Sequence, residues 1–191
     1  MKQCNNDVHE LLSKYINYNG LNSETRYLIS SFAILWNSFE RELFPSDEYR
    51  YGYTKRDVLK IIYNYEFDKF LSDKINESYG KLMGYLAFRK CAFDPERIVR
   101  FFGIFLEDLY RPDGNLFRRR DIDKDTLSRI MFSDKTKDRL SFLYLIAKKV
   151  RNNMIHGEKG LCELDEQVNL FDACNQTLAI IIAIGKSERR M

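Results

Sequence analysis

The chain has 191 residues, of which 45% are hydrophobic and 14% aromatic. This length and composition exclude an intrinsically disordered chain and leave room for one domain with a sizeable core. The net charge of +3 is mild, so it permits a local patch that binds nucleic acid but does not require one.

The four cysteines are widely spaced, at positions 4, 91, 162 and 174. No pair of them has the spacing of a zinc site or a redox motif, so we expect free thiols in a reducing cytosol, with no metal and no other cofactor. The N-terminus lacks the apolar core of a signal peptide, and the longest apolar run, 178–184, is too short to span a bilayer. These features predict a soluble cytoplasmic protein without a membrane segment.

Helical periodicity dominates the chain, and strand-like alternation is nearly absent. Only three prolines and nine glycines interrupt it, which favours long elements. In chain order the expected helices cover residues 7–18, 22–44, 54–90 in two pieces, 94–112, a short turn within the polar connection 115–133, and finally 134–156 and 165–185.

Several of these helices have recognisable ends. The second begins at Asn22 or Ser23 as its cap and is stopped by Pro45. Thr54 stands three residues before Asp57, which is an acidic variant of the capping box. The helix after residue 93 has Asp94 as its cap, Pro95 in its first position, and Pro112 and Gly114 as its exit.

The helix expected over 134–156 carries two stripes. At 100° per residue, one stripe is apolar and is expected to be the buried seam: Leu140, Leu143, Ala147, Val150 and Met154. The other stripe has four-residue spacing, lies nearly opposite the seam, and contains Lys148, Asn152 and His156. We therefore expect His156 to lie outside the core of its own domain.

A purely structural role for His156 would explain part of the sequence at this helix end. A histidine at the C-terminus of a helix is favoured by the helix dipole, and Gly157 would supply the cap. This role does not account for Asn152 and Asn153, which are poor helix formers in the last turns.

The segment RNNMIH, residues 151–156, has the form R-N-x-x-x-H and precedes one further helix. It resembles the motif of the HEPN superfamily of all-α proteins. The helix WNSFERELF resembles the first long helix of prokaryotic HEPN proteins, and the helix ending LAIIIAIG resembles their last. The resemblance implies a single helical-bundle domain over 1–191, with its core at about 22–44 and 134–186 and additional helices at about 45–133.

The same resemblance implies a metal-independent endoribonuclease, a toxin or host-defence effector that acts on RNA as a homodimer. Arg151 would stabilise the charge on the phosphodiester, and His156 would exchange protons with the ribose 2′-hydroxyl or the leaving oxygen. Asn152 would be a supporting polar group. On a regular helix Arg151 and His156 diverge by about 140° and about 7.5 Å, so we expect two copies to form one cleft across a twofold axis.

Further residues are candidates for supporting roles. Glu40 follows Trp36 by four residues and would either support the cleft or be an ordinary surface carboxylate. The run Arg118, Arg119 and Arg120, together with Lys148, would bind RNA phosphates, although a solvated charge run is an equally good interpretation of the arginines. The aromatic and basic segment 49–56 is expected to be a loop that contacts RNA or an antitoxin protein.

The alternative function is a catalytically idle HEPN module. Such a module would only dimerise or bind a partner, such as an antitoxin or a nucleotidyltransferase. The intact motif at 151–156 argues against it, because an idle module has no physical need for both the arginine and the histidine.

Overall fold

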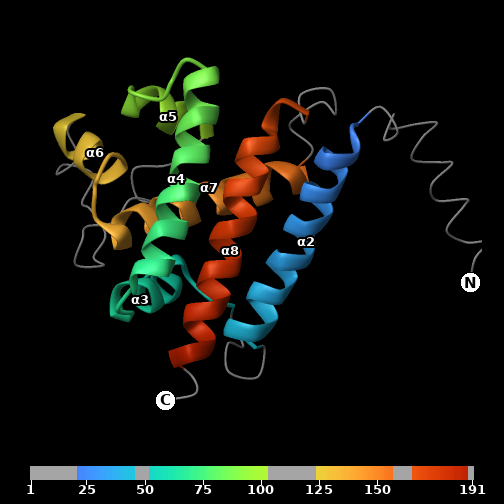
Figure 1. Cartoon of the computed structure of the whole chain (residues 1–191), viewed down its shortest axis with the longest axis vertical. Helices are drawn as coiled ribbons and strands as arrows, with labels where there is room; N and C mark the ends of the chain where they lie inside the picture. Colours follow the sequence, from blue (N-terminus) through green and yellow to red (C-terminus); the bar gives the residue numbers. More distant parts are fainter. Residues whose placement is uncertain (1–20, 46–51, 103–123, 157–164, 189–191) are drawn as a thin grey trace, which may run out of the picture.

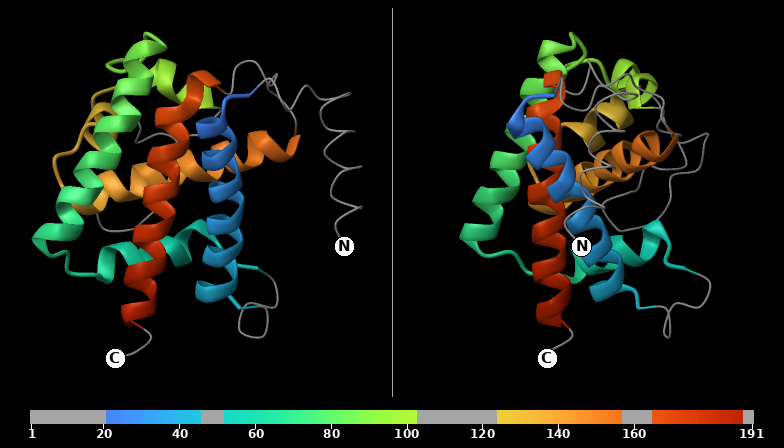
Figure 2. Two further views of the ribbon diagram at one scale, coloured as in Figure 1. Left: turned by 45° about the vertical axis from the view of Figure 1, so that its right-hand side comes forward. Right: turned by 90° about the vertical axis from the view of Figure 1, so that its right-hand side faces the viewer.

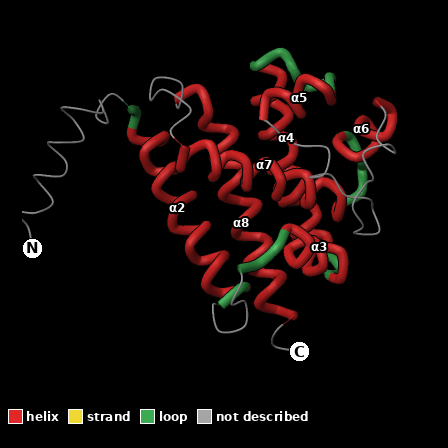
Figure 3. Tube along the Cα trace, turned by 180° about the vertical axis from the view of Figure 1, so that it is seen from behind, coloured by secondary structure: helices red, strands yellow, loops and turns green. Residues whose placement is uncertain are grey.

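The computed structural model describes residues 21–45, 52–102, 124–156 and 165–188. Within these ranges every regular element is a helix, which confirms the predicted all-α class (Figure 3). The expected helix 7–18 and the exit at Pro112 and Gly114 lie outside the described residues. The elements are α2 (Ser23–Leu43), α3 (Lys55–Asn64), α4 (Lys69–Phe88), α5 (Pro95–Phe102), α6 (Lys124–Met131), α7 (Thr136–His156), the short 3-10 helix η5 (Asp165–Gln167) and α8 (Val168–Glu188).

Helix α8 lies between α2 and α4, and these three form one layer (Figure 1). Helix α7 crosses behind that layer and packs against both α4 and α8 (Figure 2). The shorter helices α3, α5 and α6 pack against α7 on the side away from the layer or at its ends. Their buried side chains join those of the long helices in one hydrophobic cluster, so the described residues share a single core.

The three helix starts for which caps were predicted are confirmed, whereas the helices expected from 134 and 165 begin at Thr136 and Val168. The Asn22 side chain accepts the backbone N–H of Thr25 at 2.8 Å and caps α2. The Asp57 carboxylate accepts the backbone N–H of Thr54 at 2.8 Å, which is the acidic capping box expected for α3. At α5 the Asp94 carboxylate accepts the backbone N–H groups of the first turn at 3.1 and 3.2 Å.

The seam predicted for α7 is only partly right. Leu140, Leu143, Ala147 and Val150 are buried, but Met154 is 37% exposed. Moreover, all eight residues from 140 to 147 are buried, whichever way they point. The physical reason is that α7 crosses behind α8 and α4 while α3, α5 and α6 cover its other sides, so its middle has no solvent face.

Helix α8 is the most apolar element. The span Val168–Ser187 covers 20 residues, and its most apolar 18-residue window has a mean hydropathy of 1.4, so by length and composition it is long and apolar enough to cross a membrane. The expectation of no membrane segment considered only the seven-residue run inside this helix. Of the most apolar window, 61% is buried inside the protein, a property that core helices share. Near its end, Gly185 allows close approach to α2, since a Cβ there would meet Leu43 Cδ2 at 2.6 Å.

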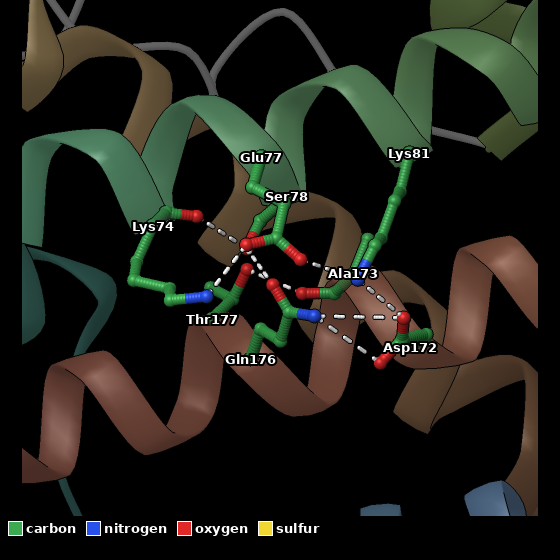
Figure 4. Close-up of polar contacts among 8 residues, drawn as sticks. All are labelled: Lys74, Glu77, Ser78, Lys81, Asp172, Ala173, Gln176 and Thr177. Atoms are coloured by element: carbon green, nitrogen blue, oxygen red, sulfur yellow. Dashed lines mark hydrogen bonds and ion pairs between the residues drawn. The ribbon is translucent and has the colours of Figure 1, made fainter.

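A group of polar side chains, here called the polar clasp, joins α4 to α8 (Figure 4). Its members are Lys74, Glu77, Ser78, Lys81, Asp172 and Gln176. The Ser78 hydroxyl lies within hydrogen-bonding distance of Gln176 Oε1, at 2.8 Å, in an otherwise buried interface. At its rim Lys81 Nζ contacts Asp172 at 2.7 Å and Glu77 at 2.9 Å. Hydrogen bonds from Lys74 and Lys81 lower the pKa of Glu77 to about 2. Each charged member of the clasp has a partner of opposite sign, so the clasp fixes the two helices and has no unpaired charge for a ligand.

Candidate functional site

The candidate site is built around one carboxylate on α2. Trp36 and Glu40 stand four residues apart and therefore on one face of the helix. The indole Nε1–H of Trp36 donates to Glu40 Oε1 at 2.8 Å, and the hydroxyl of Tyr53 donates to the same oxygen at 3.2 Å. Trp36 is only 5% exposed, so its N–H needs an internal acceptor. Glu40 supplies that acceptor and is fixed by it.

Arg151 of α7 approaches this carboxylate from the other layer. Its Nη2 lies 4.0 Å from Glu40 Oε1, and its Cζ lies 5.6 Å from the ring centroid of Trp36. Its Nη1 also donates to Asn152 Oδ1 at 3.3 Å. The side chains of Arg151 and Glu40 keep exposed fractions of 39% and 36%. The guanidinium is thus oriented by an anion and an aromatic face but remains accessible to a ligand.

Tyr53, which precedes α3, contacts Glu40 and packs against two aromatic residues of the segment that ends α2. Its ring stacks on Phe44 at 4.3 Å between centroids, and it meets the edge of Phe39 at 5.6 Å. Burial raises the pKa of the Tyr53 phenol, and the charge of Glu40 raises it further, while Arg151 opposes the shift. The phenol therefore stays protonated at neutral pH and acts as a donor to Glu40.

Lys148 lies one turn before Arg151 on the same helix. Burial lowers the pKa of its amine, and the positive charges of Lys149 and Arg151 lower it further. Its side chain is half-buried, and in the part of the chain that the structure describes no carboxylate pairs with it. The last turns of α7 therefore concentrate positive charge in a partly desolvated setting, which favours an anionic ligand.

The structure brings together Glu40, Arg151, Asn152 and, one turn away, Lys148. His156 is the last residue of α7, and its side chain lies outside the described residues. Arg118, Arg119 and Arg120 also lie outside them, so their predicted contact with RNA stays a prediction. Asn152, expected to be a supporting polar group, accepts a hydrogen bond from Arg151.

Sequence reasoning missed the anchoring role of Tyr53. The segment 49–56 was expected to contact RNA or a partner protein, with a helix beginning at Thr54. Helix α3 does begin there, and residues 49–51 lie outside the described residues. Tyr53 is half-buried and turns its hydroxyl to Glu40 instead of to solvent. No local pattern could identify this contact, because Tyr53 and Glu40 are thirteen residues apart and are separated by the stop at Pro45.

Among the described residues no group of three or more histidine, cysteine or acidic side chains is arranged to hold a metal ion. Comparison of the chain with protein-family models, with curated proteins and with solved structures gives no match. The likeness to HEPN proteins therefore rests on the motif at 151–156 and its helical setting.

Proposed function

We propose that this chain is an endoribonuclease of HEPN type, and that Arg151 and His156 act on the RNA phosphodiester. The observation that carries the proposal is the seating of Arg151. A buried tryptophan and a shared carboxylate orient the motif arginine, yet the guanidinium keeps a solvent-accessible side. The guanidinium can therefore meet a phosphodiester without first losing its contacts with Trp36 and Glu40.

The chemistry requires no group beyond the motif and the substrate. The ribose 2′-oxygen attacks the phosphorus and loses its proton to a histidine, while the bond from phosphorus to the 5′-oxygen breaks. A second proton transfer, from a histidinium, neutralises the leaving 5′-oxygen. Arg151 stabilises the charge that develops on the phosphoryl oxygens. The products are a 2′,3′-cyclic phosphate and a 5′-hydroxyl.

The proposed enzyme is a homodimer. The divergence of Arg151 and His156 on a regular helix is relieved when two copies of the α7 end meet across a twofold axis. One histidine then serves as the base and the other as the acid. We further propose a toxin or host-defence role in the cytoplasm, with an antitoxin protein as a natural partner. Expression in a bacterial host should halt growth, and His156→Ala should relieve the arrest.

Cleavage of a defined RNA by the purified chain tests the proposal. His156→Ala and Arg151→Ala should each lower the rate at least about 100-fold, as expected for loss of a general acid–base or of an oriented charge. Cleavage should survive EDTA, leave a cyclic phosphate detectable by mass spectrometry, and stop when the ribose at the cut site is replaced by 2′-deoxyribose. The rate should depend on pH around the ordinary histidine pKa of about 6.5.

Matched controls are available in the chain. His9→Ala removes the other histidine, and Arg41→Ala removes an arginine whose side chain is 77% exposed on α2. Both should cleave at the wild-type rate. If cleavage requires a divalent metal, or if the deoxy substrate is cut equally well, the nucleolytic role of His156 is wrong. If no RNA is cut while the protein still dimerises, the idle binding module becomes the better interpretation.

A further inference from the structure

The turn between α4 and α5 exposes two phenylalanines. Phe88, the last residue of α4, is 63% exposed, and Phe93 is 86% exposed. Between them Cys91 and Ala92 are buried, so this segment is anchored to the core and not loosely attached. Single exposed apolar residues are common on protein surfaces, but two large rings on one anchored turn need an explanation.

The backbone of this turn is fixed by several contacts. Lys90 has a φ of 58°, in the left-handed region, and closes the end of α4. The N–H of Cys91 donates to the carbonyl of Leu86 and the N–H of Lys90 to that of Ala87, both at 2.9 Å. Arg97 of α5 donates to the carbonyl of Lys90 at 3.3 Å. The two rings are therefore presented on a preorganised backbone, which lowers the entropy cost of binding a ligand.

The segment that carries the two rings is rich in basic residues. Residues 88–100 contain four basic residues (Arg89, Lys90, Arg97, Arg100) and two acidic ones (Asp94, Glu96), a net charge of +2. Arg89 is paired with Glu166 at 3.0 Å, and Arg97 is paired with Asp94 at 3.3 Å. In the described residues no carboxylate pairs with Lys90 or Arg100, and both are exposed.

The opposite end of α4 provides a contrast. Phe70, in the first turn, is 67% exposed, which matches Phe88. The equally long segment 64–76 contains two basic residues (Lys69, Lys74) and three acidic ones (Glu66, Asp68, Asp73), a net charge of −1. Counted along the sequence, the segment at the α5 end is therefore the more basic of the two, although Lys137 and Arg139 of α7 contact Glu66 and Asn76 at the other end. Figure 1 shows the two ends far apart, with the α4–α5 turn at the top of the molecule.

We propose that the α4–α5 turn is a docking surface for single-stranded RNA, in which Phe88 and Phe93 stack on bases while Lys90 and Arg100 contact phosphates. Exposed rings on a segment whose cations have no carboxylate partner among the described residues are the combination that binds single strands, since every base has a face for stacking. A second copy of the chain fits less well, because two positive turns would repel each other. This inference rests on the proposed function for the choice of RNA, but it concerns a surface separate from the Arg151 site.

Binding of a fluorescein-labelled single-stranded oligouridylate, measured by fluorescence anisotropy, tests the surface. The measurement uses the full chain carrying His156→Ala, so that the RNA stays intact. Phe88→Ala and Phe93→Ala should each raise the dissociation constant at least about five-fold, which corresponds to about 1 kcal/mol for a stacked base. Phe70→Ala is the matched control and should leave the dissociation constant unchanged.

Two further arms separate stacking from charge. Lys90→Gln and Arg100→Gln should each weaken binding and reduce its dependence on salt, whereas Lys69→Gln at the other end of α4 should not. A single-stranded DNA of the same length should compete through this surface, since stacking does not need the 2′-hydroxyl, while a duplex should compete poorly. DNA competition also makes the result independent of cleavage.

The outcomes distinguish this surface from the proposed function. If the wild-type protein cleaves RNA but the phenylalanine variants bind as tightly as wild type, the surface is wrong and the ribonuclease stands. If the chain binds single strands through Phe88 and Phe93 but never cleaves, the ribonuclease is wrong and the surface stands. Two results would contradict the proposed surface. One is that duplex RNA binds as tightly as single-stranded RNA. The other is that the phenylalanine variants lose binding to anionic vesicles but keep binding to RNA.

Discussion

The two halves of α7 differ sharply although they belong to one uninterrupted helix. From Leu140 to Ala147 every side chain is buried, whereas from Lys148 to Met154 only Val150 is buried. The first half is covered by α4 and α8 on one side and by shorter helices on the other. The second half carries Lys148, Arg151 and Asn152, and it ends with the R-N-x-x-x-H motif at 151–156. The first half therefore contributes mainly to stability, whereas the second half leaves charged side chains partly accessible to solvent.

The sharpest test of this contrast is a large truncation in the first half. Phe142 is 1% exposed and meets the ring of Tyr79 at 6.4 Å between centroids. Phe142→Ala should lower the free energy of unfolding by about 3–5 kcal/mol, because it removes buried area and leaves a cavity. Urea unfolding followed by circular dichroism measures this. Met154→Gln is the apolar control in the second half and should change the value by less than about 0.5 kcal/mol. Similar losses for both variants would contradict the contrast.

Replacement of Arg151 should separate function from stability. Arg151→Ala removes a cation–π contact with Trp36 and a long ion pair with Glu40, and the side chains of Arg151 and Glu40 are partly exposed. We expect a loss of about 1 kcal/mol in the free energy of unfolding, far less than for a core residue. Arg151→Lys keeps the charge but not the planar fork, so it should recover part of the stability and little of the cleavage. A loss above about 3 kcal/mol would show that Arg151 is mainly a structural residue.

The smallest expected effect is the pH dependence contributed by Lys148. Burial holds the pKa of its amine below the ordinary value in the folded protein. At a pH between the folded-state pKa and the unfolded-state pKa of about 10.4, the unfolded chain binds more protons than the folded protein. The cost of burying the charged amine therefore lowers stability fully at neutral pH, and this loss shrinks as the pH rises to about 10.4. The unfolding free energy of wild type relative to Lys148→Met should therefore increase from neutral to alkaline pH. Thermal melts at several pH values measure this difference.

A control and a contrary result are defined for Lys148. Lys69→Met removes an exposed lysine on α4 and should show no such trend relative to wild type. If the relative stability of wild type instead falls with rising pH, then Lys148 gains a partner on folding. Bound RNA should supply such a partner, so added oligonucleotide should flatten the dependence.

Much of the fold followed from local patterns. Asn22 before α2, Thr54 with Asp57 before α3, and Asp94 with Pro95 at α5 were readable because capping depends on residues within one turn of each other. The position of the motif on the last turns of a long helix was readable for the same reason. Glu40 was a candidate only because it follows Trp36 by four residues. In a helix, this spacing places the two side chains on the same face.

Other features depended on which helices meet. The sequence by itself determined the helical class, the capped starts of α2, α3 and α5, and the motif at the end of α7, because these depend on interactions within a few residues. Only the tertiary structure decided that the middle of α7 is buried on every side, that Met154 is exposed, and that Tyr53 turns its hydroxyl to Glu40. The seating of Arg151 against Trp36 and Glu40 belongs to the same class, since it joins residues more than a hundred positions apart. Such contacts depend on how α7 crosses the α2–α8–α4 layer, and no periodicity within a single helix encodes that crossing.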